Sequence, residues 1–393
     1  MSGADAARAA MNTALVARAE ALRPLLRSEA SQIERTRRLS AEVLAALHDM
    51  QAFNLQLTAA YGGPEADPLT HLRVIEALSR GDASSGWVAM VGSESSACIN
   101  AFLAPAVIRR MLVEPAAPAA ALTVVGSGKA ARTAGGYRVD GHWRFASGAR
   151  HAGFIGAFCV VHDGATPLTR DNGAPLTRMV FAPACDVEFH DTWHTSGLCG
   201  TASDDFALSN VFIPEECTAD LFGPPRDPSP VWRLPISLRF AMSKAAATCG
   251  MARGAMDALL PLLERTPFAG ARAAREEPRA HLALAAAEAA IEGGRAFLYQ
   301  NVERAWAEVC AGTLLDVNAI AAVRLAIVFA ARRAHEAVQL IQELGGTAAA
   351  FDAGLDRAAR DLAVARHHLQ LQPQVMEDVG RVLLGMAPRN PLF

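Results

Sequence analysis

The sequence has few features that would place the chain in a membrane or on nucleic acid. Its 393 residues contain no apolar stretch close to the roughly 20 residues that a membrane-spanning helix requires, and the best candidate, 319–331, is interrupted by Arg324. The 37 basic and 40 acidic residues leave a formal net charge of −3, without a basic stripe that could bind phosphates. These absences argue against a membrane and against a nucleic-acid partner.

Cysteine is scattered and never has the spacing of a metal site. The seven cysteines are odd in number, and none of them stands in a Cys-x-x-Cys pair. This usage is typical of reduced thiols and indicates a cytoplasmic protein without a disulfide framework or a bound metal. The first 24 residues carry charges of both signs, so we expect no signal peptide there.

Two motifs of common enzyme classes are absent from the sequence. There is no Gly-x-Ser-x-Gly motif, the main signal for a hydrolase with an activated serine. There is also no Rossmann fingerprint, so a nicotinamide cofactor is not indicated. With 51% apolar and 20% charged residues, the composition is that of a globular protein large enough for two or three structural units.

The hydrophobic period changes twice along the chain. Up to about residue 113, apolar residues at three- and four-residue spacing predict helices over 14–27, 40–50 and 69–80, with Ser40 as an N-cap. From about 120 to 220 the pattern favours strands, and Asp140-Gly141 is predicted as the turn of a hairpin. The clearest strand candidates cover 154–161, 178–181 and 206–213.

Long alanine-rich helices return after residue 230. One apolar face extends from Ile320 to Ile341, and Gly345-Gly346 is a natural end for that helix. A further helix is predicted over 355–368. The expected order is therefore a helical domain (1–118), a β-domain (119–226) and a second helical domain (227–393).

Three segments carry more specific motifs. Residues 61–63 are Tyr-Gly-Gly, 136–148 contain Trp-Arg-Phe-Ala-Ser-Gly after a strand pattern, and 191–203 run from Asp-Thr-Trp to Gly-Thr-Ala-Ser. With the order of the three domains, these segments resemble the acyl-CoA dehydrogenase superfamily over nearly the whole chain. The resemblance implies an α+β fold with an N-terminal helical domain, a small central β-domain and a C-terminal four-helix bundle.

Within that superfamily, the sequence is most similar to the two-component, reduced-flavin-dependent monooxygenases of the 4-hydroxyphenylacetate hydroxylase and dibenzothiophene monooxygenase type. The similarity lies in Trp-x-Phe-x-Ser-Gly at 143–148, Ser-x-x-Trp at 84–87, and Arg360-Asp361 followed by His368. It implies an oxygenase component that uses O2 to hydroxylate a small aromatic molecule through a C4a-(hydro)peroxyflavin. A separate NAD(P)H:flavin reductase would supply FMNH2, or else FADH2.

The resemblance also implies roles for single residues. Ser147 matches the hydroxyl near flavin N5, and His368 matches the imidazole that takes a phenolic proton or manages the peroxide proton, a task that its ordinary pKa near 6.5 suits. If 355–368 is helical, the adjacent His367 diverges from His368 by about 100°, and His367 is the fallback if the register is wrong by one residue. Trp87 either lines the substrate cavity or only packs in the core.

The flavin-binding positions that the resemblance implies come from several parts of the chain, some of them across a subunit interface. They are Leu122, Thr123, Phe145, Ser147, Arg265, Phe268, Gly345 and Gly346. A homotetramer is expected with them, because the apolar faces of 231–265 and 317–345 exceed what one side of a bundle needs.

Two alternatives stay open. An FAD-dependent acyl-CoA dehydrogenase needs a carboxylate base at one of two places in the family, but here 367–370 occupies the first region, and Leu238-Arg239 puts leucine where the second has glutamate. Such an enzyme would need a displaced base. A non-catalytic flavin-fold binding protein is disfavoured because both Ser147 and His368 are present.

Overall fold

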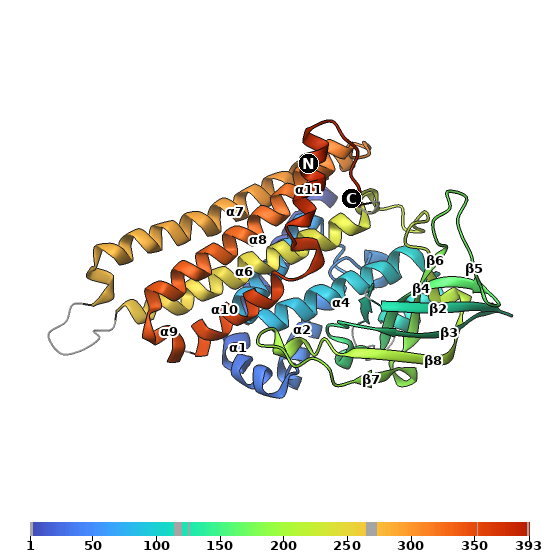
Figure 1. Cartoon of the computed structure of the whole chain (residues 1–393), viewed down its shortest axis with the longest axis horizontal. Helices are drawn as coiled ribbons and strands as arrows, with labels where there is room; N and C mark the ends of the chain where they lie inside the picture. Colours follow the sequence, from blue (N-terminus) through green and yellow to red (C-terminus); the bar gives the residue numbers. More distant parts are fainter. Residues whose placement is uncertain (1–2, 114–119, 125, 265–272, 352, 391–392) are drawn as a thin grey trace.

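The computed structural model describes residues 3–113, 120–124, 126–264, 273–351, 353–390 and 393. It contains a helical N-terminal part, a sheet and a second helical part, in the order expected (Figure 1). None of the helices within these described residues is both long and apolar enough to cross a membrane.

The N-terminal helices begin where the sequence offers caps. The Ser40 side chain accepts a hydrogen bond from the amide of Val43, while Asp67 and Asp82 cap the two helices that follow. This confirms the predicted helices and the Ser40 cap. The bounds are α1 Gly3–Thr36, α2 Ala41–Asp49, α3 Pro68–Gly81, α4 Ala83–Phe102 and the short α5 Pro105–Ile108.

The central part is one mixed sheet in the order β7-β8-β3-β2-β4-β6-β9, with β1 and β5 also paired to β4. The three strand candidates are confirmed as parts of β4, β6 and β8. The bounds are β1 Ala120–Thr123, β2 Gly126–Thr133, β3 Gly136–Trp143, β4 Phe154–Asp163, β5 Thr166–Pro167, β6 Thr177–Pro183, β7 Glu188–His190, β8 Asp205–Pro214 and β9 Thr218–Ala219.

The predicted hairpin turn at Asp140-Gly141 is wrong. Both residues lie inside the continuous strand β3, and the turn that joins β2 to β3 lies at residues 134–135, where Gly135 has a φ of +75°. The register of β3 with β8 shifts at this point, and the Asp140 carboxylate accepts a hydrogen bond from the Asn210 amide at 2.7 Å. The Asp-Gly pair therefore faces a bulge in β8.

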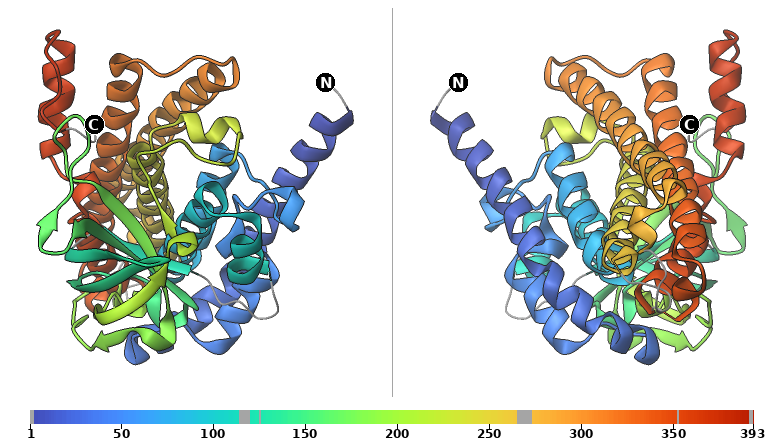
Figure 2. Two further views of the ribbon diagram at one scale, coloured as in Figure 1. Left: turned by 90° about the vertical axis from the view of Figure 1, so that its right-hand side faces the viewer. Right: turned by 90° about the vertical axis from the view of Figure 1, so that its left-hand side faces the viewer.

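The C-terminal helices α6, α7 and α8 run side by side, away from the sheet (Figures 1 and 2). Gly345 ends α8 as predicted, whereas the helix predicted over 355–368 ends at Ala365, so His368 follows it. The bounds are α6 Ile236–Leu263, α7 Pro278–Cys310, α8 Val317–Gly345, α9 Thr347–Phe351, α10 Ala353–Ala365 and α11 Gln374–Leu383.

Helix α4 lies at the centre of the molecule, between the sheet and α6 (Figure 1). Every residue of α4 except Phe102 is buried. Its first half packs into the core formed with α1, α3, α6 and α10, and its second half packs into the core of the sheet. A side chain on α4 is therefore close to both halves of the protein.

The apolar faces that we expected to mark a subunit interface are mostly used inside the chain. Val323, Ile327 and Val338 of α8 are at most 3% exposed, and most of α6 is buried against α3 and α8. These faces form the intramolecular core, so they do not argue for a second subunit.

Candidate functional site

One part of the site lies at the end of β1. The hydroxyl of Thr123 donates to the backbone oxygen of Arg144 at 2.7 Å, which joins β1 to the segment that follows β3. Leu122 is half-buried against the core of the sheet. The structure thus brings the expected flavin positions Leu122 and Thr123 beside Phe145.

Phe145 is held in an unusual conformation. Its φ is +61°, and its side chain is 44% exposed although it is aromatic. The guanidinium of Arg144 lies 4.8 Å from the ring centroid, and the Trp193 ring meets it edge-on at 6.1 Å. Strained backbone at non-glycine residues concentrates at functional sites, and Leu198 and Ala202 of the neighbouring loop share this feature. The exposed, fixed ring is suited to pack against a flat ligand.

Ser147 begins a chain of buried hydroxyls. Its Oγ lies 2.7 Å from Ser203 Oγ, which lies 2.7 Å from Thr201 Oγ1, and Thr201 donates to the Leu198 oxygen at 2.8 Å. A hydroxyl has one proton to donate. Because Thr201 uses its proton on Leu198, Ser203 must donate to Thr201, and Ser147 must donate to Ser203. The remaining lone pairs of Ser147 are then free to accept a hydrogen bond from a ligand.

The start of α4 joins this segment to His368. Gly148, with a φ of +75°, packs so closely that an added Cβ would lie 3.0 Å from Val88 Cγ1. One residue earlier on α4, the buried Trp87 ring contacts the His368 ring at a centroid distance of 5.8 Å. Gly148, which follows Ser147, and His368 therefore lie against adjacent residues of one helix.

His368 is half-buried and begins a short 3-10 turn after α10. Its Nδ1 accepts a hydrogen bond from the backbone N–H of Gln370 at 3.3 Å. In a neutral ring the proton is therefore on Nε2. Burial, assisted by the charge of Lys244, lowers the pKa of His368 well below its ordinary value. The imidazole is therefore neutral near pH 7, with Nε2–H as a donor. His367 is exposed in the turn.

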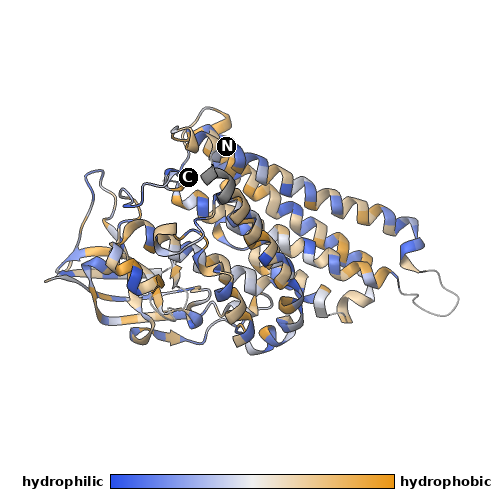
Figure 3. Cartoon of the chain, turned by 180° about the vertical axis from the view of Figure 1, so that it is seen from behind, coloured by the Kyte–Doolittle hydropathy of each residue, from blue (hydrophilic) through white to orange (hydrophobic). Residues whose placement is uncertain are grey.

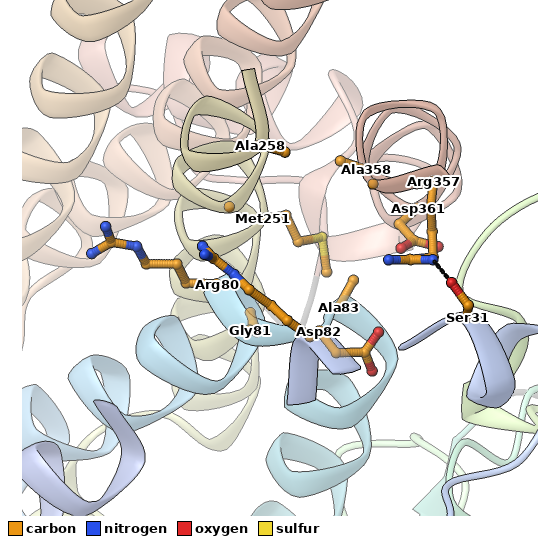
Figure 4. A pocket seen from close by; sticks show the side chains of 14 residues that line it. Ser31, Arg80, Gly81, Asp82, Ala83, Met251, Ala258, Arg357, Ala358 and Asp361 are labelled. Atoms are coloured by element: carbon orange, nitrogen blue, oxygen red, sulfur yellow. Dashed lines mark hydrogen bonds between the residues drawn. The ribbon is translucent and has the colours of Figure 1, made fainter. Parts of the chain in front are cut away.

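Asp361 fixes the loop that carries the hydroxyl chain. Its carboxylate accepts a hydrogen bond from the Leu198 amide at 2.6 Å, and a Cβ added to Gly197 would lie 2.1 Å from the Arg360 oxygen. Burial, and then the nearby Asp82, raise the pKa of Asp361 to about 7. Both carboxylates border a cavity of about 340 Å³ in which Arg357 donates to Ser31 (Figure 4).

Other expected flavin positions are not brought together with this cluster. Gly345 and Gly346 end α8 beside α9, at the end of the bundle remote from the sheet (Figure 1). Arg265 and Phe268 lie outside the described residues. One chain thus places Leu122, Thr123, Phe145, Ser147, Trp87 and His368 in one region and the two glycines in another.

A buried charged cluster that the sequence did not predict lies between α4 and α6. Lys244 Nζ lies 2.9 Å from Glu94 Oε2, each side chain is 6% exposed, and Ser243 donates to the same carboxylate. Burial raises the pKa of Glu94, opposed by Lys244. The only sequence signal was a single carboxylate in a run of small and apolar residues, 86–101. Trp193, Thr201 and Ser203 lie inside the 191–203 motif, but the sequence assigned no role to them.

Two stretches of the chain match domains of known proteins. Residues 14–117 match the acyl-CoA dehydrogenase N-terminal domain, and residues 242–373 match the acyl-CoA dehydrogenase C-terminal domain. The chain belongs to the acyl-CoA dehydrogenase superfamily. The expected resemblance and fold class are thereby confirmed.

The curated relatives of this superfamily member are oxygenases. The chain is 29% identical to an indole-3-acetate monooxygenase of Pseudomonas putida, over 92% of this chain and 91% of the relative. It is 28% identical to the oxygenase subunit HsaA, a flavin-dependent monooxygenase of Rhodococcus jostii, over 91% and 94% of the two chains. The crystal structure of 3-HSA hydroxylase from Rhodococcus sp. RHA1 has the same fold, with a TM-score of 0.88, 24% identity, and coverage of 96% and 99%.

Proposed function

We propose that this protein is the oxygenase component of a two-component flavin-dependent monooxygenase that hydroxylates a small aromatic molecule. The observation that carries the proposal is the orientation of Ser147, whose hydroxyl is left as an acceptor by the chain through Ser203 and Thr201. A reduced flavin carries N–H at N5, whereas the oxidised ring has only an acceptor there. The site therefore fits reduced flavin better than oxidised flavin.

The described residues fit a flavin ring in three ways. The exposed ring of Phe145, with Trp193 beside it, offers an apolar surface for the ring system. Ser147 supplies the acceptor, and Leu122 and Thr123 border the same segment. Bound reduced flavin supplies the electrons that activate O2. The protein's part is to hold the ring, exclude water, and place the Nε2–H of His368 as a donor to the substrate or to oxygen.

The dehydrogenase alternative requires a free carboxylate base. Leu238 is fully buried where the family has glutamate on the first bundle helix. Glu94, the buried carboxylate between α4 and α6, is bound by Lys244 and Ser243. Since its oxygens are engaged by a cation and a hydroxyl, Glu94 is not a free base. The described residues therefore favour the oxygenase.

The test uses purified protein and an external source of electrons. With FMNH2 or FADH2 prepared anaerobically, admission of O2 and an aromatic substrate is expected to give a hydroxylated product that contains one atom from ¹⁸O2. The protein mixed with NADH and oxidised flavin is expected to consume no NADH, because no nicotinamide-binding motif is present. Catalytic NADH oxidation by the protein alone, or bleaching of tightly bound FAD by an acyl-CoA, would contradict the proposal. The choice between FMN and FAD follows from which reduced flavin binds more tightly.

We also propose a homotetramer located in the cytoplasm. Support for a second copy comes from the separation of Gly345 and Gly346 from the other flavin positions, since a neighbouring subunit could bring the two groups together. Hydrophobic residues also remain exposed on α7 and α8, including Phe329 at 37% and Leu282 at 75%. Figure 3 shows hydrophobic and hydrophilic residues alternating along these helices. Light scattering at micromolar concentration is expected to give four times the mass of one chain, and the mass of a monomer would contradict this. All seven cysteines are free thiols, as suits a reducing compartment.

A further inference from the structure

Arg239, on α6, is a buried cation without an anionic partner. It is 6% exposed, its Nη2 donates to Gln56 Oε1 at 2.7 Å, and its guanidinium lies 3.8 Å from the Trp232 ring centroid. Its Nη1 has no hydrogen-bond partner, and within the described residues no carboxylate lies at ion-pair distance from it. A buried charge is costly unless it is paired. The unpaired guanidinium of Arg239 therefore indicates a site for an anionic ligand.

His71, on α3, faces the same place with a second unpaired nitrogen. It is 5% exposed, and its Nε2 has no hydrogen-bond partner in the described part of the chain. Burial, together with the charges of Arg239 and Lys244, lowers its pKa to about 3. His71 is therefore neutral near pH 7, and a ring with the proton on Nε2 is a donor that does not add to the local positive charge.

A small cavity lies between these two side chains. Its lining includes Gln56, His71, Glu94, Arg239, Phe240 and Met242, and its volume is about 10 Å³, enough for about one water molecule. Glu94 is neutralised by Lys244 and does not supply the missing anion. A larger group enters only if the lining moves, and the thioether of Met242 in that lining is flexible.

This cavity is placed at a useful distance from the reactive end of the site. Glu94, which borders it, and Trp87, which contacts His368, are seven residues apart on α4. Seven residues are close to two helical turns, so both side chains lie on one face, roughly 10 Å apart along the axis. An aromatic ring with a short carboxylate side chain is a molecule of about this length.

We infer that Arg239 and His71 form a subsite for the carboxylate of an aromatic acid, whose ring lies toward Trp87 and His368. Arg239 Nη1 and His71 Nε2 each donate to the carboxylate, and the guanidinium balances its charge. The inference rests on the proposed function and specifies its substrate class. Arg239 acts on specificity, and it takes no part in the reaction with oxygen.

The test compares acids with their neutral amides. Binding of indole-3-acetate, phenylacetate and benzoate, and of the three corresponding amides, is measured anaerobically to the protein loaded with reduced flavin. At least one acid is expected to bind about 10- to 100-fold more tightly than its amide, the range for hydrogen bonds to a charged group. Arg239→Gln should remove this preference while Arg239→Lys restores part of it, and His71→Leu should weaken it. Arg233→Gln is the control, because Arg233 is exposed on the preceding turn and donates to the Val309 oxygen.

The outcomes separate this inference from the proposed function. If no acid binds more tightly than its amide, or if Arg239→Gln keeps the preference, the carboxylate subsite is wrong. If neutral aromatics are hydroxylated as well as the acids, the oxygenase is supported and the subsite again fails. If reduced flavin and O2 hydroxylate nothing while acids still bind through Arg239, the subsite stands and the proposed function fails. Circular dichroism and thermal unfolding of each variant identify a loss of folding.

Discussion

His368→Ala is expected to lower the rate of substrate hydroxylation by about 10²- to 10³-fold, the usual cost of removing one positioned hydrogen-bond donor. The substitution removes the Nε2–H donor but leaves Ser147 and the hydroxyl chain intact. The affinity for reduced flavin should therefore stay within a factor of two. Rapid mixing of the reduced-flavin complex with O2 and substrate measures the rate, and anaerobic titration measures the affinity.

His367→Ala is the matched control and is expected to be nearly silent, because His367 is exposed in the turn. In the wild-type enzyme, the titration of His368 should give no inflection of the rate near pH 6.5, since the pKa of His368 in the folded protein lies well below that value. If His367→Ala lost activity and His368→Ala kept it, the role assigned to His368 would belong to His367. Full coupled activity in both variants would contradict an imidazole role altogether.

Local signals in the sequence located the helices α1, α2, α3, α8 and α10 and the strands β4, β6 and β8. Ser40 and Asp82 cap helices because a short polar side chain satisfies free backbone N–H groups, whatever the rest of the fold does. Asp140-Gly141 failed as a turn signal because Tyr137, Val139 and Trp143 keep the same face buried across it. That alternation was itself visible in the sequence, and it indicated one continuous strand.

The site could be predicted only where the resemblance supplied it. Ser147 and His368 are 221 positions apart, and their relation depends on α4, which packs against both segments. The buried pair Glu94–Lys244 and the unpaired Arg239 depend on the packing of α4, α3 and α6 together. No spacing along the chain reports which polar side chains become buried, because burial is decided by elements distant in the sequence.

Ser147→Ala is expected to separate oxygen consumption from hydroxylation. In the proposed site, this hydroxyl, oriented by the chain through Ser203, would accept the N5 proton of reduced flavin. Its removal leaves that proton unpaired in a largely buried site, at a cost that corresponds to a roughly 10- to 100-fold change. We expect hydrogen peroxide release to rise by about this factor and product yield per O2 to fall, while flavin binding persists through Phe145 and Trp193.

Two further variants test the orientation of the hydroxyl as well as its presence. Ser203→Ala removes the acceptor of the Ser147 proton, so Ser147 becomes free to turn, and an intermediate level of hydrogen peroxide is expected. Ser209 lies in the exposed bulge of β8, so the control variant Ser209→Ala should behave as the wild type. Peroxide and product are measured together in single-turnover reactions. If Ser147→Ala stays fully coupled while Ser203→Ala loses flavin binding, the chain of hydroxyls supports the loop structure and does not tune the flavin.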